Sequence, residues 1–158
     1  QATWESTASL WACSSAHANI IYHAAGWMEG GLCASFEKFV IDCELLQQFA
    51  YYQKPIGVSD EDLAVDAIRD VGPSGHFLGA DHTQSRFKDA YYSPFLSDWR
   101  NFESWEQSGS IETPMRANRI YKEVLAEYVE PPMESAIREE LTGFVERRKK
   151  EGGAPTDF

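Results

Sequence analysis

The sequence is poor in several features that would each point to a particular class of protein. Its 14 lysine and arginine residues face 25 aspartate and glutamate residues, which gives a formal net charge of −11. This excess of acid disfavours nucleic acid as a partner, because phosphate backbones are bound by clustered cationic side chains. No apolar run approaches the roughly 20 residues that span a bilayer, and no secretory signal pattern opens the chain. We therefore expect a soluble protein with no nucleic-acid or membrane partner.

Cysteine is also scarce, with only Cys13, Cys33 and Cys43 present and no Cys-x-x-Cys pair among them. An odd, widely spaced set argues against a disulfide framework and fits a reduced, cytoplasmic setting. The sequence contains no Gly-x-Ser-x-Gly nucleophile elbow and no Gly-x-x-x-x-Gly-Lys phosphate loop. Neither serine-hydrolase chemistry nor a phosphate-binding loop is therefore indicated.

Hydrophobic residues make up 43% of the 158 residues, enough for one domain with a substantial core. The chain begins at Gln1, and its first methionine is Met28. We therefore expect these residues to be a piece of a longer product.

Helical patterns dominate the chain. Ser35 is placed to cap a long helix that ends before Pro55. Ser59 and Asp62 form a capping box for a second helix, which Gly72 ends. Further helices are expected over residues 3–16, 83–92 and 99–105, from residue 113 up to the prolines at 131–132, and over a terminal stretch that begins near residue 133.

Two short segments have the composition of strands. Residues 19–23 read Asn-Ile-Ile-Tyr-His, a β-branched and aromatic run typical of a buried parallel strand, and residues 76–78 form a shorter candidate. The two expected strands alternate with helices, and the rest of the chain contains helices without a further strand. This order predicts the end of an α/β domain with a helical extension. Two strands cannot form a self-sufficient parallel sheet, so this order also predicts a missing N-terminal portion.

The first candidate site is the glycine-rich stretch that follows residues 19–23. His23 stands at the carboxyl end of the expected strand, where ligands bind in α/β sheets and barrels, and Glu29 follows in the loop. Trp27 lies between them and could face a cationic ligand through its ring. The alternatives are a hydrogen-bonded core histidine, a solvated glutamate and a tryptophan that only packs.

A second candidate lies in residues 72–83, a glycine-rich stretch with three glycines that contains His76, Asp81 and His82. These side chains are compatible with zinc, but their spacing matches none of the strong zinc signatures, so no metal site is predicted. The alternative interpretation is an ordinary helix end followed by a tight turn.

Three segments, which follow one another along the chain, together resemble one known family. Residues 23–32 read His-Ala-Ala-Gly-Trp-Met-Glu-Gly-Gly-Leu, residues 35–42 read Ser-Phe-Glu-Lys-Phe-Val-Ile-Asp, and residues 72–83 follow. Together they resemble the C-terminal part of the trimethylamine:corrinoid methyltransferase family, and the resemblance extends to about Val145.

The resemblance implies an α/β fold, here a predominantly helical C-terminal fragment of a (β/α)8 TIM barrel with a helical extension. Residues 1–93 would hold the last β/α units, residues 94–151 the extension, and residues 152–158 a disordered tail. It further implies transfer of a methyl group from a methylated amine to the cobalt of a corrinoid carried by a partner protein. No cofactor would be bound directly, and a homo-oligomer is among the expected assemblies.

On this resemblance, His23 and Glu29 are the expected catalytic residues. Trp27, His76 and His82 would line the substrate pocket. The fragment alone would be inactive, and the choice between quaternary and tertiary amines stays open. The competing hypothesis is a non-enzymatic, acidic helical module that binds another protein.

Overall fold

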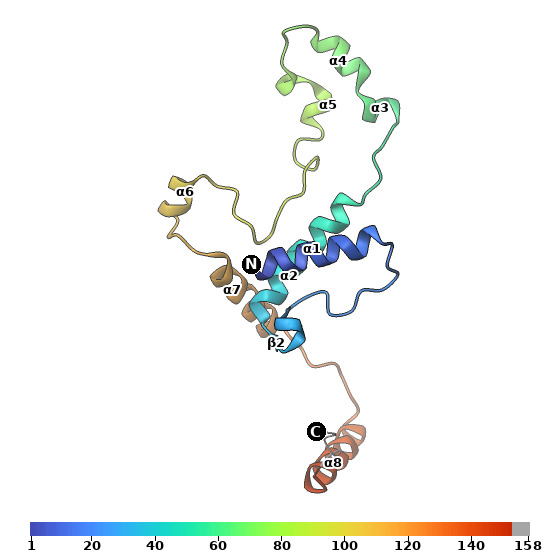
Figure 1. The fold of residues 1–158 in the computed structure, drawn as a ribbon, viewed down its shortest axis with the longest axis vertical. Coiled ribbons are helices and arrows are strands. Elements are labelled where there is room, and N and C mark those ends of the chain that lie inside the picture. The colour runs from blue at the N-terminus through green and yellow to red at the C-terminus, as the bar shows by residue number, and fades with distance from the viewer. Residues whose placement is uncertain (153–158) are drawn as a thin grey trace. The chain divides into compact units, whose positions relative to one another are not determined.

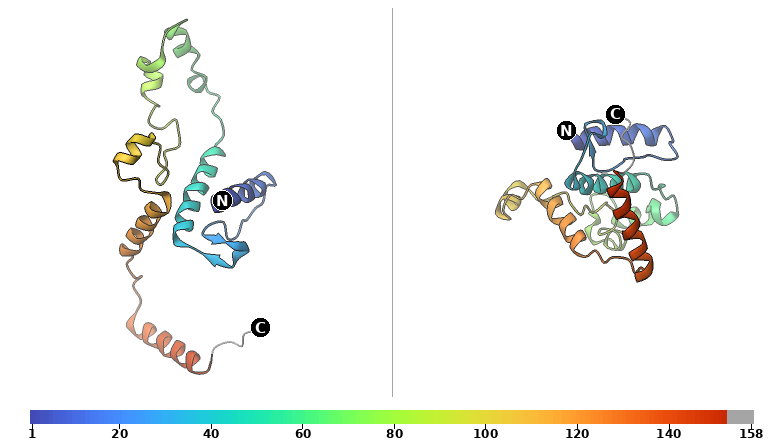
Figure 2. Two further views of the ribbon diagram at one scale, coloured as in Figure 1. Left: turned by 60° about the vertical axis from the view of Figure 1, so that its left-hand side comes forward. Right: turned by 90° about the horizontal axis from the view of Figure 1, so that it is seen from below.

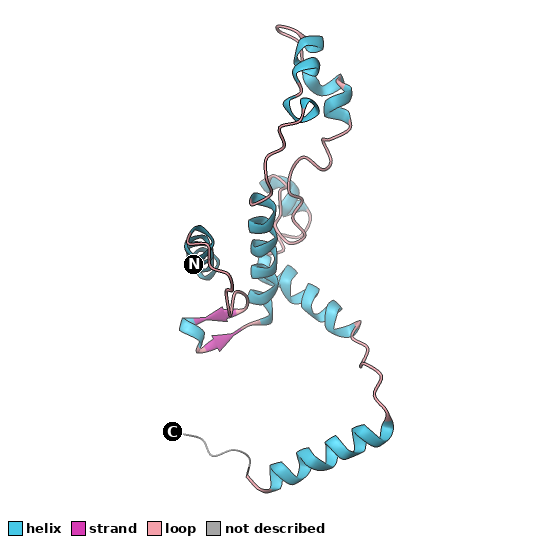
Figure 3. Ribbon diagram, turned by 90° about the vertical axis from the view of Figure 1, so that its right-hand side faces the viewer, coloured by secondary structure: helices cyan, strands magenta, loops and turns pink. Residues whose placement is uncertain are grey.

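The computed structural model describes residues 1–152, and helices make up nearly all of their regular structure (Figure 1; Figure 3). The predominantly helical character predicted from the sequence is therefore confirmed. The chain divides into two compact units, Gln1–Leu125 and Ala126–Phe158. Among the residues described, no helix combines the length and apolar character needed to cross a bilayer.

Two long helices and a small hairpin form the first part of the larger unit. Helices α1 (Ala2–Ser15) and α2 (Phe36–Tyr52) contact each other, and the ring of Trp11 lies 5.5 Å from that of Phe49. Both helices were expected, and the predicted Ser35 cap is confirmed, because its hydroxyl accepts the N–H of Lys38 at 3.1 Å. Side-chain capping of this kind satisfies backbone groups that the first turn leaves unpaired.

The hairpin connects α1 to α2. Strand β1 (Trp27–Met28) pairs with β2 (Cys33–Ala34) in antiparallel register, and a single turn of 3-10 helix, η1 (Glu29–Gly31), joins them. Figure 2 shows the two arrows of the hairpin, and β2 leads into α2. The glycine-rich stretch is therefore a structured turn whose glycines adopt left-handed backbone angles that other residues rarely take.

A small core lies between α2 and α7 (Thr113–Ala126). Val40, Leu96 and Ala117 are buried there, and the ring of Phe36 stacks on that of Tyr121 at a centroid distance of 5.1 Å. The helix expected from Thr113 is thus confirmed, but it ends at Ala126 and does not extend to the prolines at 131–132. A carboxylate supports this core, because buried Glu44 accepts the backbone N–H groups of both Leu96 and Ser97.

The segment between α2 and α7 is built from short elements: α3 (Asp60–Leu63), α4 (Val65–Val71), η2 (Phe77–Gly79), α5 (Asp81–Gln84) and α6 (Phe102–Gln107). The Ser59–Asp62 capping box is present, as predicted. The single helix expected after it is wrong, because Ala64 adopts φ 52° and separates α3 from α4.

Two further expectations for this segment are wrong. Residues 76–78 form the start of a 3-10 turn and not a strand, and the helix expected from Thr83 to Tyr92 ends at Gln84. The apolar side chains that should have been buried are open, with Ile68 56% exposed and Leu63 54% exposed. Helices in this length range depend on tertiary packing of an apolar face, and this segment has little of it.

The strand expected over residues 19–23 is also wrong. These residues form an irregular connection between α1 and β1, with Ile20 69% exposed and Tyr22 79% exposed. A strand exists only when a neighbour satisfies its backbone groups. Within residues 1–152, no backbone group pairs with this segment.

The smaller unit contains α8 (Ser135–Lys150), the terminal helix that the sequence predicted. Ile137, Leu141 and Phe144 follow the helical spacing on one face, and each is about half exposed. Four cations in its last turn complement the negative end of the helix dipole. The predicted tail lies almost wholly outside the described residues, and the boundary predicted near residue 93 stays a prediction.

Candidate functional site

A cavity of about 560 Å3 lies between α1 and the connection that leads into the hairpin. One wall comes from α1, where Glu5, Ser6 and Cys13 face it, and the other comes from residues 21–31. Its volume is within the range of pockets that hold small molecules. Three of the five residues predicted for the site line this cavity: His23, Trp27 and Glu29.

Aromatic rings form one side of the cavity. The imidazole of His23 meets the indole of Trp27 edge-on, with centroids 5.1 Å apart and planes at 90°, and the ring of Tyr22 lies 6.4 Å from that of His23. Edge-to-face geometry within this distance is favourable. His23 also adopts φ 56°, an uncommon angle for a residue with a side chain. Such strain is often found at functional sites.

Carboxylates supply the charge of the cavity. Glu5 and Glu29 both line it, and within residues 1–152 neither carboxylate forms a salt bridge. Glu29 opens the 3-10 turn at φ 51°, so its position depends on the strained hairpin turn. The Glu5 carboxylate accepts a hydrogen bond from the side-chain amide of Gln1, and its negative charge is not neutralised by it. Two such carboxylates in a cavity with aromatic rings can hold an organic cation, because charge and ring faces both attract it.

A buried ion pair joins the two walls of the cavity. The ammonium group of Lys38 donates to Asp42 at 2.5 and 2.6 Å and to the hydroxyl of Ser6 in α1 at 2.7 Å. Asp42 in turn accepts the backbone N–H of Gly26 at 2.8 Å, just before β1. Since Lys38 is 4% exposed and Asp42 1% exposed, water does not compete for these contacts. The pair therefore fixes α1 and the hairpin against α2.

Sequence reasoning did not single out Lys38, Asp42 or Glu5. A signal for the first two exists: they are four residues apart on α2, and Asp42 interrupts a face of otherwise apolar residues. A carboxylate on such a face needs a buried cationic or hydrogen-bonding partner. Glu5 carries no comparable signal, because an acidic residue in the first turn of a helix is common for electrostatic reasons.

His76 and His82 are not brought to this cavity. His76 precedes η2, and His82 lies in α5, where its Nε2 atom is 2.9 Å from the backbone oxygen of Glu61. Their role in substrate binding stays a prediction. Within the described part of the chain, no group of three or more histidine, cysteine, aspartate or glutamate side chains is arranged to hold a metal ion.

Comparison with known proteins identifies related sequences over nearly the whole chain. The family model described as trimethylamine methyltransferase (MTTB) matches residues 1–153. The chain is 35% identical to a glycine betaine methyltransferase of Desulfitobacterium hafniense (strain Y51) over 153 residues, which cover 97% of this chain and 32% of the relative. It is 34% identical to the trimethylamine methyltransferase MttB2 of Methanosarcina mazei over 147 residues, 93% of this chain and 29% of that protein. This chain thus spans about a third of the length of these relatives.

Proposed function

The chain belongs to the trimethylamine methyltransferase family, and we propose that it is part of an enzyme that demethylates a methylated amine. The methyl acceptor in this proposal is the cobalt of a corrinoid that a separate protein carries. The cavity between α1 and the hairpin is the proposed amine site. The observation that carries the proposal is that His23, Trp27 and Glu29, all within a stretch that resembles the family, line this one cavity.

The chemistry of a methylated ammonium group matches these side chains. A quaternary ammonium has no N–H to donate, so it must be held by charge and by ring faces. Trp27 and Tyr22 offer ring faces, and Glu5 and Glu29 offer two negative charges. The pair Lys38–Asp42 sets the spacing between the walls that carry these groups.

The proposed reaction breaks one carbon–nitrogen bond and forms one carbon–cobalt bond. The bonding pair stays on nitrogen, so a cationic amine leaves as a neutral amine with one methyl group fewer. The reduced corrinoid of the partner supplies the electron pair for the new bond. In this scheme Glu29 and Trp27 hold and orient the cation. His23 donates a proton to the nitrogen lone pair only after the carbon–nitrogen bond has broken and the neutral amine has formed.

The proposal places these residues in a (β/α)8 barrel that the whole family polypeptide forms in the cytoplasm. Three cysteines without a disulfide fit this setting. Because the chain spans about a third of its relatives, we expect the isolated chain to be inactive. The catalytic unit would need the remaining two thirds.

A chimaera tests this proposal. Residues 1–158 would replace the matching region of the glycine betaine methyltransferase, and the product would be assayed for methyl transfer to a reduced corrinoid protein. Trimethylamine, tetramethylammonium and glycine betaine are the substrates to compare. Activity that Trp27→Leu and Glu29→Gln both lower would support the proposal. A folded chimaera that demethylates none of these amines would contradict it.

A further inference from the structure

The terminal helix α8 carries an apolar face, and none of its residues is buried. Ile137, Leu141 and Phe144 recur every three or four residues, and their exposed fractions lie between 49% and 51%. Val145 lies beside them and is 45% exposed. Single exposed apolar residues are normal on a protein surface, whereas a continuous apolar stripe marks an interaction site. This stripe therefore indicates that a partner covers α8.

Charge is distributed unevenly along the same helix. Glu139 and Glu140 lie in its first half, and the four cations of residues 147–150 form its last turn. Arg138, the one cation of the first half, pairs with Glu130. Two such helices side by side in the same direction would bring their cationic ends together, and like charges repel. In opposite directions, the acidic part of each helix would face the basic part of the other, and the helix dipoles would attract.

Two charges beside the apolar stripe have no ion-pair partner on their own chain. Glu140 and Arg147 lie on the same flank of the stripe, seven residues apart, and within residues 1–152 neither forms a salt bridge. Lys149, by contrast, pairs with Glu146 of its own helix. In paired helices, charges at such flanking positions set the partner and its orientation. A free acid and a free base at this spacing therefore fit a second α8 that runs antiparallel.

We propose that α8 is a self-association surface through which two copies of the chain pair their terminal helices in antiparallel orientation. The spacing sets the register: where Leu141 of each copy lies opposite Phe144 of the other, Glu140 of each lies beside Arg147 of the other. Two-fold symmetry forms each of these contacts twice. The inference rests on α8 alone and not on the proposed reaction. The expected homo-oligomer thereby gains a surface and an orientation.

The charge of the whole chain opposes association, but α8 differs from the rest. The chain carries a formal net charge of −11, whereas α8 has five basic and three acidic residues. A face covered by the remainder of a family polypeptide would not require complementary charges within α8 itself. One pair of helices buries less than the roughly 1,600 Å2 of a standard interface, so we expect a weak dimer with a Kd on the order of 100 µM.

The first test follows self-association of the 158-residue chain by analytical ultracentrifugation, from about 10 µM to about 1 mM. Leu141→Asp should weaken the dimer at least about 100-fold, because the pairing would bury a carboxylate in the apolar stripe. Leu63→Asp is the matched control, since Leu63 is 54% exposed on α3 and lies outside α8. It should leave the Kd within about twofold of the native value. Circular dichroism checks that both variants keep their helicity.

Charge reversal tests the orientation. Glu140→Arg should weaken the dimer roughly tenfold, because it sets two cations beside each other at both symmetric contacts. Arg147→Glu should have a similar effect, and the double variant should recover the native Kd, since opposite charges meet again. Glu139→Arg is the control for charge alone, because Glu139 lies on the opposite side of the helix. Both substitutions to arginine make the chain less negative, so an association governed by net charge would become stronger in each.

Three outcomes would overturn the proposal. The first is a chain that stays monomeric over the whole concentration range. The second is a dimer that Leu141→Asp and Leu63→Asp weaken equally. The third is a double charge variant that stays as weak as the single variants, which would exclude the antiparallel contact. None of these measurements depends on methyl transfer, so they stand apart from the test of activity.

Discussion

The carboxylate of Asp42 accepts the backbone N–H of Gly26 at 2.8 Å, although sixteen positions separate the two residues. The same carboxylate binds the ammonium group of Lys38, which also donates to Ser6 of α1. One buried negative charge thus connects three segments of the chain. Because the cavity lies between two of those segments, its width depends on this charge.

Asp42→Ala should destabilise the chain by about 3–5 kcal/mol, because it leaves the ammonium group of Lys38 buried without its partner. The measurement is the free energy of unfolding from urea titration. The double variant Lys38→Met, Asp42→Leu should recover most of the loss, since it removes both charges. A double variant as unstable as Asp42→Ala would show that packing, and not the unpaired charge, causes the effect.

Gly26→Ala should cost about 2–3 kcal/mol of stability. Gly26 has φ +84°, and an added Cβ would lie 3.2 Å from the Cβ of Phe39, so strain and crowding act together. Gly30→Ala is the control, because Gly30 has φ +64° but open space around its Cβ position. It should cost only about 1 kcal/mol from backbone strain. Equal losses for the two variants, measured by urea titration, would remove the crowding explanation.

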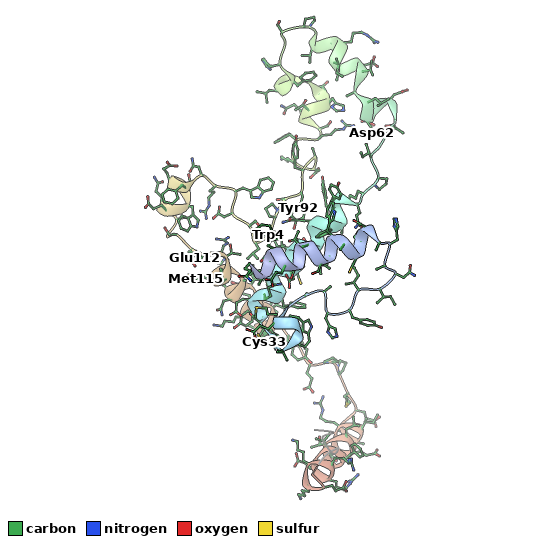
Figure 4. The ribbon with its side chains drawn as sticks, in the orientation of Figure 1. Trp4, Cys33, Asp62, Tyr92, Glu112 and Met115 are labelled. Atoms are coloured by element: carbon green, nitrogen blue, oxygen red, sulfur yellow. The ribbon has the colours of Figure 1, made fainter. Side chains whose placement is uncertain are left out.

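Substitutions in the cavity should weaken the binding of tetramethylammonium to the chimaera. Trp27→Leu removes a ring face and should cost about 1 kcal/mol, roughly a fivefold loss of affinity. Glu29→Gln removes a negative charge and should weaken binding by a similar amount. This loss of affinity should become smaller as salt is added, because salt screens the charge. Trp4→Leu is a control at a tryptophan that is 77% exposed on α1 and does not line the cavity (Figure 4). Isothermal titration with all three variants decides whether the cavity is the cation site.

Stability should fall in acid partly through Asp98. Hydrogen bonds from Arg100 hold the pKa of the Asp98 carboxyl well below its usual range. A carboxylate with a lowered pKa in the folded state stabilises the fold above its unfolded pKa of about 4, and this contribution is lost as pH falls toward the folded value. The stability difference between the native chain and Asp98→Asn should therefore be larger at pH 7 than at about pH 3. Urea midpoints at the two pH values measure it, and a difference that grows in acid would contradict the assignment.

Glu44→Ala should destabilise the small core by about 2–3 kcal/mol. The Glu44 carboxylate is 3% exposed and accepts the N–H groups of Leu96 and Ser97, which would become buried donors without partners. Glu44→Gln keeps one acceptor oxygen and should cost less. Hydrogen exchange at Leu96 reports the loss directly, and unchanged protection there in both variants would contradict this role.

Local chemistry made part of this structure predictable. The hydroxyl of Ser35 caps α2, the Ser59–Asp62 capping box is present, and Thr113 begins α7. Each of these signals acts within one helical turn. Such signals do not depend on what the rest of the molecule provides.

The failures occur where distant contacts decide the conformation. Residues 19–23 have a strand composition, but no other strand lies beside them, so their backbone stays unpaired in the described residues. The helix after Ser59 breaks at Ala64 because its apolar residues find little to pack against. Composition predicts what a segment could form, whereas pairing decides what it does form.

In the candidate site, too, local features were predictable from the sequence and contacts between distant residues were not. His23, Trp27 and Glu29 come together because they follow each other in one loop, and the sequence therefore predicted their grouping. His82 instead contacts the backbone of Glu61, a relationship between distant turns that no motif indicated. The Lys38–Asp42 pair was detectable only as a charge on an apolar helix face.

All residues that line the cavity fall between Ala2 and Gly31. A single continuous stretch therefore encodes both walls of the candidate site, and only the Lys38–Asp42 support lies beyond it. Recombination that exchanges residues 1–42 between two relatives would transfer the cavity together with the buried pair that holds it. With the cavity as the proposed amine site, substrate preference would be exchanged between relatives as one short block of sequence.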